Sequence, residues 1–479
     1  MTQDPVPTES PYQRRRPFRV IVRLSREFVA DTHADLAEAA KASGLRELAE
    51  ILAAYGMRGT RLIDSISPGR LRELERQNPP EDPEQPSLTQ YWQIDLSGNE
   101  ADPEDVAARL NGLPGVELAY VELPVIDAGG PDGEPAPAAA AAAVQANHLD
   151  AGPIGSNVRW AWEQHAAHGA EVQVLDVESG WMFDHEALSP LKLTMQGGVN
   201  QHGVGGFRGS HGTAAVGIVA GSYVAPQGVH GICTAAAVLV ASPFNGGAPP
   251  RPLASVLVGA LPALRSGDVV LIEVAALEGG VSTRYQRPVE REVAVRDAIG
   301  LLTRFGIVVI EPAGNGNAGL DGLGTANGRC QLDPGGPGYV DSGAVMVGGA
   351  FVDTAAPAGS IPARWVSTDE PGVGSNYGGR VDCYSWARRV YTSGCRPWGN
   401  CKPATKAYQN FNGTSSASAI IAGVAVLVQT VLKAKGRPPL TSGELRQVFA
   451  DAGNGTPSAP GSGIGTMPDL RLVAAGLGL

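Results

Sequence analysis

The chain has 479 residues and a formal net charge of −11 at pH 7. This length exceeds the roughly 250 to 300 residues that one hydrophobic core usually supports, so we expect two domains. The negative charge argues against a nucleic-acid partner or an anionic membrane surface, because both would repel the protein. We find no uninterrupted apolar run of about eighteen residues or more, so no membrane span is predicted.

The first part of the chain shows no pattern typical of a folded element. Residues 1–16 are polar and without periodicity, and we expect them to be disordered. Arg14 to Arg16 precede Pro17 and Phe18 rather than an apolar stretch with a small-residue cleavage site. No secretory signal is therefore predicted. A cytoplasmic location is favoured, and export by another route stays open.

Residues 17–126 alternate strand and helix patterns and predict a small α+β domain of the split β-α-β-β-α-β, ferredoxin-like type. An additional helical segment is expected at about Arg70 to Arg76. The remaining expected elements are strands at Arg19 to Leu24, Thr60 to Ile63, Tyr91 to Leu96 and Val116 to Val121, and helices at Asp35 to Tyr55 and Asp105 to Leu113.

Residues 127–148 form the expected connector between two domains. The stretch from Gly129 to Ala146 is rich in proline, glycine and alanine, which is typical of an exposed linker. We assign residues 149–479 to the second and larger domain.

The larger domain alternates apolar strands with helices, which predicts an α/β fold with a parallel sheet and helices on both faces. Expected strands are Glu171 to Asp176, Ala236 to Ser242, Val269 to Val274, Gly306 to Ile310 and Ala344 to Gly348. Expected helices are Pro252 to Ser266, with Pro262 near its end, Pro288 to Phe305, and Thr441 to Ala452 with a capping box at its start.

Three polar side chains lie at the ends of predicted strands or at the start of a helix. Asp176 ends a buried strand, where α/β proteins place their chemistry. His211 lies on a Gly-Thr turn that opens a helix of small residues, and such a helix can pack closely and fix the imidazole. Asn315 follows another buried strand and is flanked by Gly314 and Gly316.

The cysteines and histidines do not predict a metal site. His185 and Glu186 lack the second histidine of a zincin helix, and the five cysteines lack paired CxxC spacing. Cys395 and Cys401 could close a loop in an oxidising compartment, with Cys383 nearby, but we favour reduced thiols. We find no loop that specifies calcium, so no cofactor or metal is predicted, although calcium stays possible.

The most informative segment begins at Asn412 and leads through Gly413 and Thr414 to Ser415, followed by an apolar run to Val428. A serine on a glycine-led turn at the start of a buried helix lies beside free backbone N–H groups, which can receive a developing oxyanion. Taken alone, the same pattern is also that of an ordinary helix N-cap.

Together the four motifs, in the order Asp, His, Asn, Ser, resemble those of subtilisin-like serine peptidases. This resemblance implies a subtilisin-like fold and an endopeptidase that forms an acyl-enzyme on Ser415. His211 would be the base, Asp176 its carboxylate partner and Asn315 the oxyanion donor, while Glu273, Val274, Ala275 and Gly314 would line the substrate-binding edge.

Two glutamates depart from the family pattern. A typical member has Ser or Thr and then Gly directly after the acid, whereas Asp176 is followed by Val177 and Glu178, an apparent extension of two residues. Glu178 receives no role in this interpretation. Glu273 replaces the serine of a pocket-lining Ser-Leu-Gly edge, which suggests either a preference for Arg or Lys at the cleaved position or a solvated charge.

The segment Ala108 to Val121 resembles the inhibitory propeptide of the same family. That resemblance implies a self-inhibited precursor in which a tail after Val121 lies as an extended strand across the cleft. Self-cleavage would then remove roughly the first 125 to 148 residues. An independent binding domain is the other interpretation of residues 17–126.

Other functions are less well supported by the residues. An inactive relative that binds peptides in the same cleft is the main alternative, because Glu178 and Glu273 are unusual there. A lipase or esterase lacks support because no Gly-x-Ser-x-Gly elbow surrounds Ser415. A sedolisin-like acid peptidase would use Glu and Asp where this chain has His211 and Asn315. The expected partners are a protein or peptide substrate and the chain's own N-terminal domain.

Overall fold

The computed structural model describes residues 19–28, 33–96, 98–128, 147–202, 208–224, 228–245, 250–280, 282–351, 360–394 and 407–479. The expectation of disorder for residues 1–16 and that of an exposed linker over 129–146 therefore lie outside the described residues, as do Cys395 and Cys401. Cys383 is buried with a free thiol.

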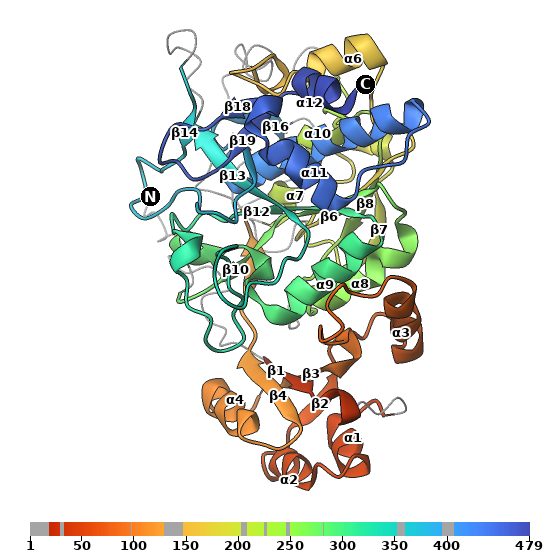
Figure 1. The fold of residues 1–479 in the computed structure, drawn as a ribbon, viewed down its shortest axis with the longest axis vertical. Helices are drawn as coiled ribbons and strands as arrows, with labels where there is room; N and C mark the ends of the chain where they lie inside the picture. Colours follow the sequence, from red (N-terminus) through yellow and green to blue (C-terminus); the bar gives the residue numbers. More distant parts are fainter. Residues whose placement is uncertain are drawn as a thin grey trace, which may run out of the picture.

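The N-terminal part contains a four-stranded antiparallel sheet with the order β2-β3-β1-β4 (Figure 1). Its strands are β1 (Arg19–Leu24), β2 (Arg58–Arg61), β3 (Tyr91–Asp95) and β4 (Val116–Val121). Its helices are α1 (Leu36–Ala42), α2 (Arg46–Ala54), α3 (Pro68–Gln77) and α4 (Pro103–Asn111).

The single helix expected over Asp35 to Tyr55 is two helices in the structure, because the chain turns at Gly44. This glycine has φ +80°, a left-handed conformation that side chains rarely adopt. Asp35 caps α1 by accepting from the backbone of Ala37 and Glu38. The break lets both helices bury leucines against the sheet, among them Leu36 and Leu48.

The larger part is built on a mostly parallel sheet with the order β18-β19-β15-β13-β12-β9-β6-β8-β7, to which β14 adds beside β13. Its strands are β6 (Gln173–Val177), β7 (Thr194–Gly197), β8 (Ala237–Ala241), β9 (Val269–Ile272), β12 (Val308–Pro312), β13 (Val345–Phe351), β14 (Ala363–Arg364), β15 (Cys383–Trp386), β18 (Gly455–Pro457) and β19 (Thr466–Pro468). The pairs with β14 and within β18-β19 are antiparallel, and the others are parallel.

Helices cover both faces of this sheet (Figure 1). Alternate strand residues face opposite cores, so that Val174 and Leu271 pack in one core while Leu175 and Val270 pack in the other. The helices are α6 (Val158–His165), α7 (Arg208–Ala220), α8 (Leu253–Ala260), α9 (Val293–Arg304), α10 (Thr414–Ala434), α11 (Ser442–Ala450) and α12 (Leu470–Leu477). This is the expected α/β architecture.

Helix α10 is the central helix of one core. In the described part of the chain it is the one helix long and apolar enough to cross a membrane, and it is fully buried inside the protein. Its packing against α7, β13 and β15 holds its first turn in place. Composition alone does not distinguish such a core helix from a membrane span.

The N-terminal sheet packs against α8 and α9 of the larger part, below them in the view of Figure 1. Ile21 and Tyr120 belong to the same apolar cluster as Leu257 and Ile299. Polar contacts add to this interface, since Tyr91 Oη donates to Asp297 Oδ2 at 2.6 Å in a buried position. The N-terminal sheet and helices α8 and α9 therefore share one apolar core.

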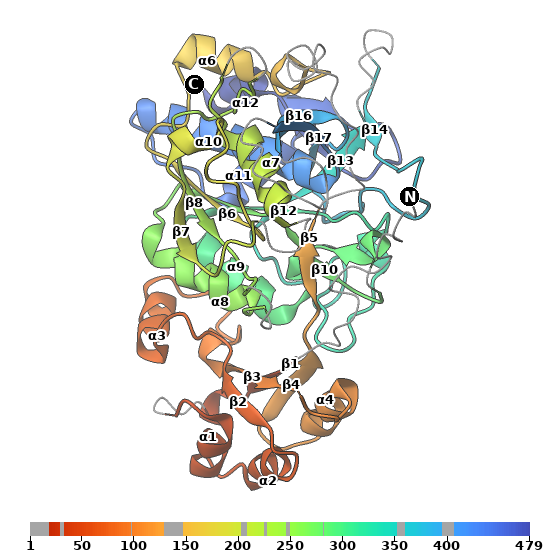
Figure 2. The same ribbon diagram turned by 180° about the vertical axis from the view of Figure 1, so that it is seen from behind.

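Beyond β4 the chain leaves the N-terminal sheet and runs up to the larger part as strand β5 (Val125–Asp127). Strand β5 pairs antiparallel with β10 (Val274–Leu277), and the two lie side by side in Figure 2. Strand β11 (Gln286–Arg287) pairs with the other edge of β10. Asp127, the last residue of β5, is therefore also the first residue of the linker expected over 127–148.

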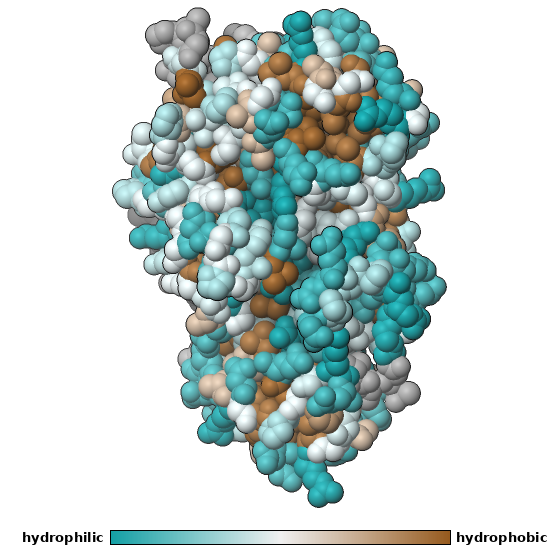
Figure 3. Space-filling view, in the orientation of Figure 1, coloured by the Kyte–Doolittle hydropathy of each residue, from teal (hydrophilic) through white to brown (hydrophobic). Residues whose placement is uncertain are grey.

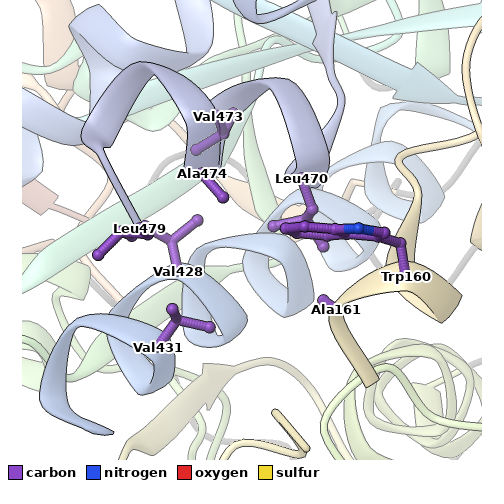
Figure 4. A pocket seen from close by; sticks show the side chains of 8 residues that line it. All are labelled: Trp160, Ala161, Val428, Val431, Leu470, Val473, Ala474 and Leu479. Atoms are coloured by element: carbon purple, nitrogen blue, oxygen red, sulfur yellow. The ribbon is translucent and has the colours of Figure 1, made fainter. Parts of the chain in front are cut away.

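A shallow apolar hollow lies between α6, α10 and α12 (Figure 4). Apolar surface gathers near the top of the view in Figure 3, where these elements lie in Figure 1. The hollow is lined by Trp160, Ala161, Val428, Val431, Leu470, Val473, Ala474 and Leu479. Val428 and Val431 are in the second half of α10, whereas Ser415 is in its first turn, so the hollow is separate from the residues expected to carry chemistry.

We expect Tyr91→Phe to weaken the docking of the N-terminal sheet. It removes the buried hydrogen bond to Asp297 and should lower the free energy of unfolding by about 1–3 kcal/mol. Urea unfolding of the full chain, with Ser415 replaced by alanine to prevent chain cleavage, measures this change. The control is Tyr223→Phe at a side chain that is 46% exposed, where about 0.5 kcal/mol or less is expected. Equal effects of the two substitutions would contradict the assignment.

Candidate active site

The carboxylates of the candidate site lie at the end of β6. Asp176 is on the strand and Glu178 is two residues later, so both side chains point to the same face of the sheet. Asp176 Oδ2 accepts from the indole Nε1 of Trp181 at 2.7 Å. Glu178 Oε2 accepts from the backbone N–H of Ser179 at 3.1 Å, and its Oε1 contacts Nδ1 of His211.

The carboxylate against the imidazole is therefore Glu178 and not the expected Asp176. Strand β6 extends to Val177, one residue beyond the expected end at Asp176. Glu178 is therefore the first residue after the strand, and its carboxyl contacts His211. The sequence contained a signal for this arrangement. Ser179 and Gly180 directly follow Glu178, which is the acid-Ser-Gly order typical of the family, so no extension of two residues is needed.

His211 lies in the first turn of α7, as the sequence predicts. Gly212 lets this turn approach the preceding loop, because a Cβ there would lie 2.6 Å from Trp181 Nε1 and 2.7 Å from the carbonyl of Gly180. The Thr213 hydroxyl accepts from the backbone N–H of Met182 at 2.8 Å. The loop that carries the acid and the helix that carries the imidazole are thus fixed to each other.

Ser415 lies in the first turn of α10, after Gly413. That glycine has φ +90°, so the tight turn before the serine requires a residue without a side chain. The backbone N–H of Thr414 donates to Asn315 Oδ1 at 2.8 Å, and the Thr414 hydroxyl donates to the same oxygen at 3.0 Å. The structure therefore brings Asn315 to the start of the serine helix.

The amide of Asn315 is oriented by contacts at both ends. Gly314, with φ +88°, makes the turn after β12 that presents it. While Thr414 holds the oxygen, Nδ2 donates to Gln286 Oε1 at 2.8 Å and also to the backbone carbonyl of Ala128. The Asn315 amide therefore connects the start of α10 to the residue that follows β5.

The extended segment is held along the substrate-binding edge expected from the sequence. Val274 and Ala275 of β10 pair with Asp127 and Ile126 of β5. At the end of this ladder the backbone N–H of Ala128 donates to the carbonyl of Glu273 at 2.9 Å. The chain therefore delivers the Ala128 carbonyl to the Asn315 amide by regular β-pairing.

The side chain of Glu273 does not face an open cleft. It is fully buried, and its Oε1 accepts from the Ser418 hydroxyl at 2.8 Å, inside the core beneath the serine helix. The residue whose backbone N–H pairs with the Glu273 carbonyl is the small and buried Ala128. A preference for Arg or Lys at the cleaved position stays a prediction, and this contact with Ser418 does not favour it.

Buried carboxyls dominate the electrostatics of the site. Burial raises the pKa of Asp176 to about 8, opposed by the hydrogen bond from Trp181 and supported by Asp127. Burial also raises the pKa of Glu178 well above its usual range, and the carboxyls of Asp127, Asp176 and Glu273 raise it further. The pKa of Glu273 is likewise raised, first by burial.

The imidazole is neutral in this arrangement, because burial lowers the pKa of His211 to about 3. Within the described residues, its Nε2 has no hydrogen-bond partner, and the Ser415 hydroxyl lies near the Glu273 carboxyl, whose pKa it lowers. Both side chains are almost completely buried, and so is Asn315. The structure thus joins His211 to Glu178 and Asn315 to Ala128, and it shows no hydrogen bond between Ser415 and His211.

A search of protein-family models found no match, and neither did a search of curated proteins. Solved structures do match. Fervidolysin from Fervidobacterium pennivorans, a keratinolytic enzyme related to subtilisin, aligns with a TM-score of 0.57 and 13% identity over 96% of this chain. The chain spans 61% of the length of that structure.

Two further structures are similar at TM-scores below one half. The prenylagaramide maturation protease PagA has a TM-score of 0.46 and 16% identity over 67% of this chain and 98% of its own. A serine-to-alanine mutant of the protease domain of PatA has a TM-score of 0.45 and 17% identity over 66% of this chain and 98% of its own. With the likeness to fervidolysin and the mostly parallel sheet between two helical layers, we conclude that the chain has a subtilisin-like fold.

We expect Asp176→Asn to change how stability depends on pH. A carboxyl whose pKa is about 8 when folded and about 3.9 when unfolded binds a proton on folding between these values, so its contribution to stability falls as pH rises from 4 to 8. The slope is at most about 1.4 kcal/mol per pH unit. The asparagine still accepts from Trp181 but does not titrate, so the variant should gain stability relative to its parent towards pH 8.

Thermal unfolding at pH 5 and pH 8, in a Ser415→Ala background, measures this gain. The control is Asp369→Asn, at a side chain that is 80% exposed, for which the difference from the parent should not change with pH. A constant difference for Asp176→Asn as well would contradict the raised pKa.

Proposed function

We propose that the protein is a serine endopeptidase made as a self-inhibited precursor, with Glu178, His211 and Ser415 as its catalytic residues. The observation that supports this most is the contact between the Asn315 amide and the Ala128 carbonyl. In this contact a peptide carbonyl of the chain itself accepts from the amide that we propose as the oxyanion donor, near the first turn of α10, where Ser415 lies. The subtilisin-like fold is consistent with this proposal.

In the proposed reaction, Ser415 Oγ attacks the carbonyl carbon of the scissile peptide bond, and His211 Nε2 takes the hydroxyl proton. Glu178 holds Nδ1 and stabilises the imidazolium that forms. Asn315 Nδ2 donates to the oxygen on which charge develops. The imidazolium then gives its proton to the leaving amine. Water releases the acyl group from Ser415 in a second step of the same kind.

The same geometry predicts where the chain is cut. Because the carbonyl of Ala128 meets Asn315, Ala128 is the residue before the scissile bond, and cleavage separates Ala128 from Gly129. The three residues before Ala128 form β5 and keep the segment paired with β10 after cleavage. The N-terminal part would then inhibit as a bound product. This agrees with the burial of Ser415, which no external peptide can reach in this form.

An inactive peptide-binding protein is the second candidate. It is favoured by the lack of a hydrogen bond between Ser415 and His211 within the described residues. Both candidates bind an extended peptide along β10. They differ in whether Ser415 becomes acylated, so chain cleavage separates them.

Intact-mass analysis of the full chain tests the proposal directly. We expect the wild type to release a fragment that ends at Ala128, because this carbonyl lies at the oxyanion donor. Ser415→Ala should stay whole, since loss of the serine costs about 10⁶-fold in related enzymes. Ser458→Ala, at a partly exposed serine elsewhere, is the matched control and should be processed normally. Equal processing of the wild type and Ser415→Ala would instead indicate a different protease.

The two candidate acids can be separated by amide substitutions. Glu178→Gln removes the carboxylate at Nδ1 of His211 and should slow cleavage by about 10⁴-fold, as the corresponding change does in other serine proteases. Asp176→Asn preserves the acceptor for Trp181 and should retain activity within about tenfold. The cleavage rate at the Ala128–Gly129 bond measures both effects. A larger loss of cleavage rate in Asp176→Asn than in Glu178→Gln would instead identify Asp176 as the carboxylate partner of His211.

A further inference from the structure

Asp127 is the second residue before the proposed scissile bond, and its side chain lies in the site rather than in solvent. Its backbone is fixed by pairing with Val274 and by Gln286, whose Nε2 donates to the Asp127 carbonyl at 3.2 Å. The direction of the Asp127 side chain is therefore set by the ladder. In an extended strand, neighbouring side chains alternate, so Asp127 and Ala128 point to different parts of the cleft.

The Asp127 carboxyl has partners on the acid loop. Ser179 Oγ donates to Asp127 Oδ2 at 2.7 Å. The Asp127 carboxyl also lies close enough to that of Glu178 to raise the pKa of Glu178. Together with His211, these two carboxyls place one ligand atom each within 4.8 Å of the others. A side chain from the chain's own tail is thus in direct contact with the residues proposed to carry out catalysis.

The contact between two carboxyls requires a proton. Like charges this close cannot both be ionised at low cost, so one proton is shared between the pair. The other titratable groups that face Glu178 are Asp176 on β6, Glu273 between β9 and β10, and His211 on α7. The first two are carboxyls, and the imidazole is neutral. Within this set, no cation compensates a second negative charge.

We propose that Ser179, Glu178 and His211 form a subsite for an acidic side chain at the second position before the scissile bond, which holds that side chain in its protonated form. The proposal rests on the proposed function for its cleavage step only, since it concerns which segment the cleft binds. The substrate class that it names is a peptide with aspartate followed by a small residue. The chain's own Asp127-Ala128 segment is the example bound in the structure.

Proton sharing makes retention of the tail depend on pH. Withdrawal of Asp127 lets the proton dissociate, so binding of the tail is accompanied by proton uptake. A rise in pH therefore weakens binding and favours release of the tail. At acidic pH the carboxyl pair keeps its proton and the tail stays in the cleft. The N-terminal part would then inhibit more strongly in acid than at neutral pH.

Amide hydrogen exchange in the full chain with Ser415→Ala tests this without any need for catalysis. The readout is the protection of the peptide that covers residues 125–128, whose Ala128 N–H is bonded to Glu273. We expect protection to fall by about tenfold or more between pH 5.5 and pH 8 after correction for intrinsic exchange, as expected for loss of one shared proton. Asp127→Asn imitates the protonated acid and should keep its protection at both pH values.

Two further variants complete the exchange experiment. Ser179→Ala removes the donor to Asp127 and should lower protection at pH 5.5, whereas Asp105→Asn, at an exposed aspartate of α4, should behave as its parent. An equal fall with pH in the parent and in Asp127→Asn would overturn the proposal. So would a parent whose protection rises with pH.

The substrate preference is measured on wild-type protein that has processed itself. Two peptides that differ only in aspartate or asparagine before alanine are compared at pH 5.5 and pH 8. We expect the ratio of kcat/KM for aspartate over asparagine to fall by about tenfold or more over this range, and a constant ratio overturns the preference. If the exchange result is obtained while neither peptide is cleaved, the proposed peptidase activity fails and the acid subsite stands.

Discussion

The hydrogen bond from Asn315 to the carbonyl of Ala128 is the contact on which the interpretation of the whole site depends. It connects the serine helix, through Thr414, to a segment that belongs to the N-terminal part of the chain. Strand β10 provides the register, and Gly314 and Gly413 provide the two turns that bring the amide and the serine together.

The fold explains why these groups meet. The parallel strands β6, β9 and β12 end at the same edge of the sheet, so Glu178, Glu273 and Asn315 follow neighbouring strands and emerge close together. Helices α7 and α10 pack against each other in the core on one face and present their first turns at this edge. Burial raises the pKa of the Glu178 carboxyl, and the Asp127 carboxyl of β5 raises it further. Binding of the β5 segment is therefore coupled to proton uptake.

Much of this arrangement could be predicted from the sequence, and the exceptions have physical reasons. Asn315 and Ser415 follow glycine turns at Gly314 and Gly413, which local sequence identifies, and His211 lies in the first turn of α7 beside Gly212. The contact of Glu178 with His211 does not follow from periodicity, because Asp176 and Glu178 are two positions apart and periodicity does not say where β6 ends. The break at Gly44 was missed because both helices have the same apolar spacing. The position of Asp127 depends on the pairing of β5 with β10, which lie far apart in the sequence, so local sequence patterns do not predict it.

In the proposed precursor, residues 125–128 of the chain itself block access to Ser415. A fluorophosphonate probe that reacts with activated serines measures this most directly, by the rate at which Ser415 is labelled. Labelling should be slow in the intact chain and fast after the fragment ending at Ala128 has been separated from the rest. Labelling at the same rate in both forms, or in neither, would contradict the proposal.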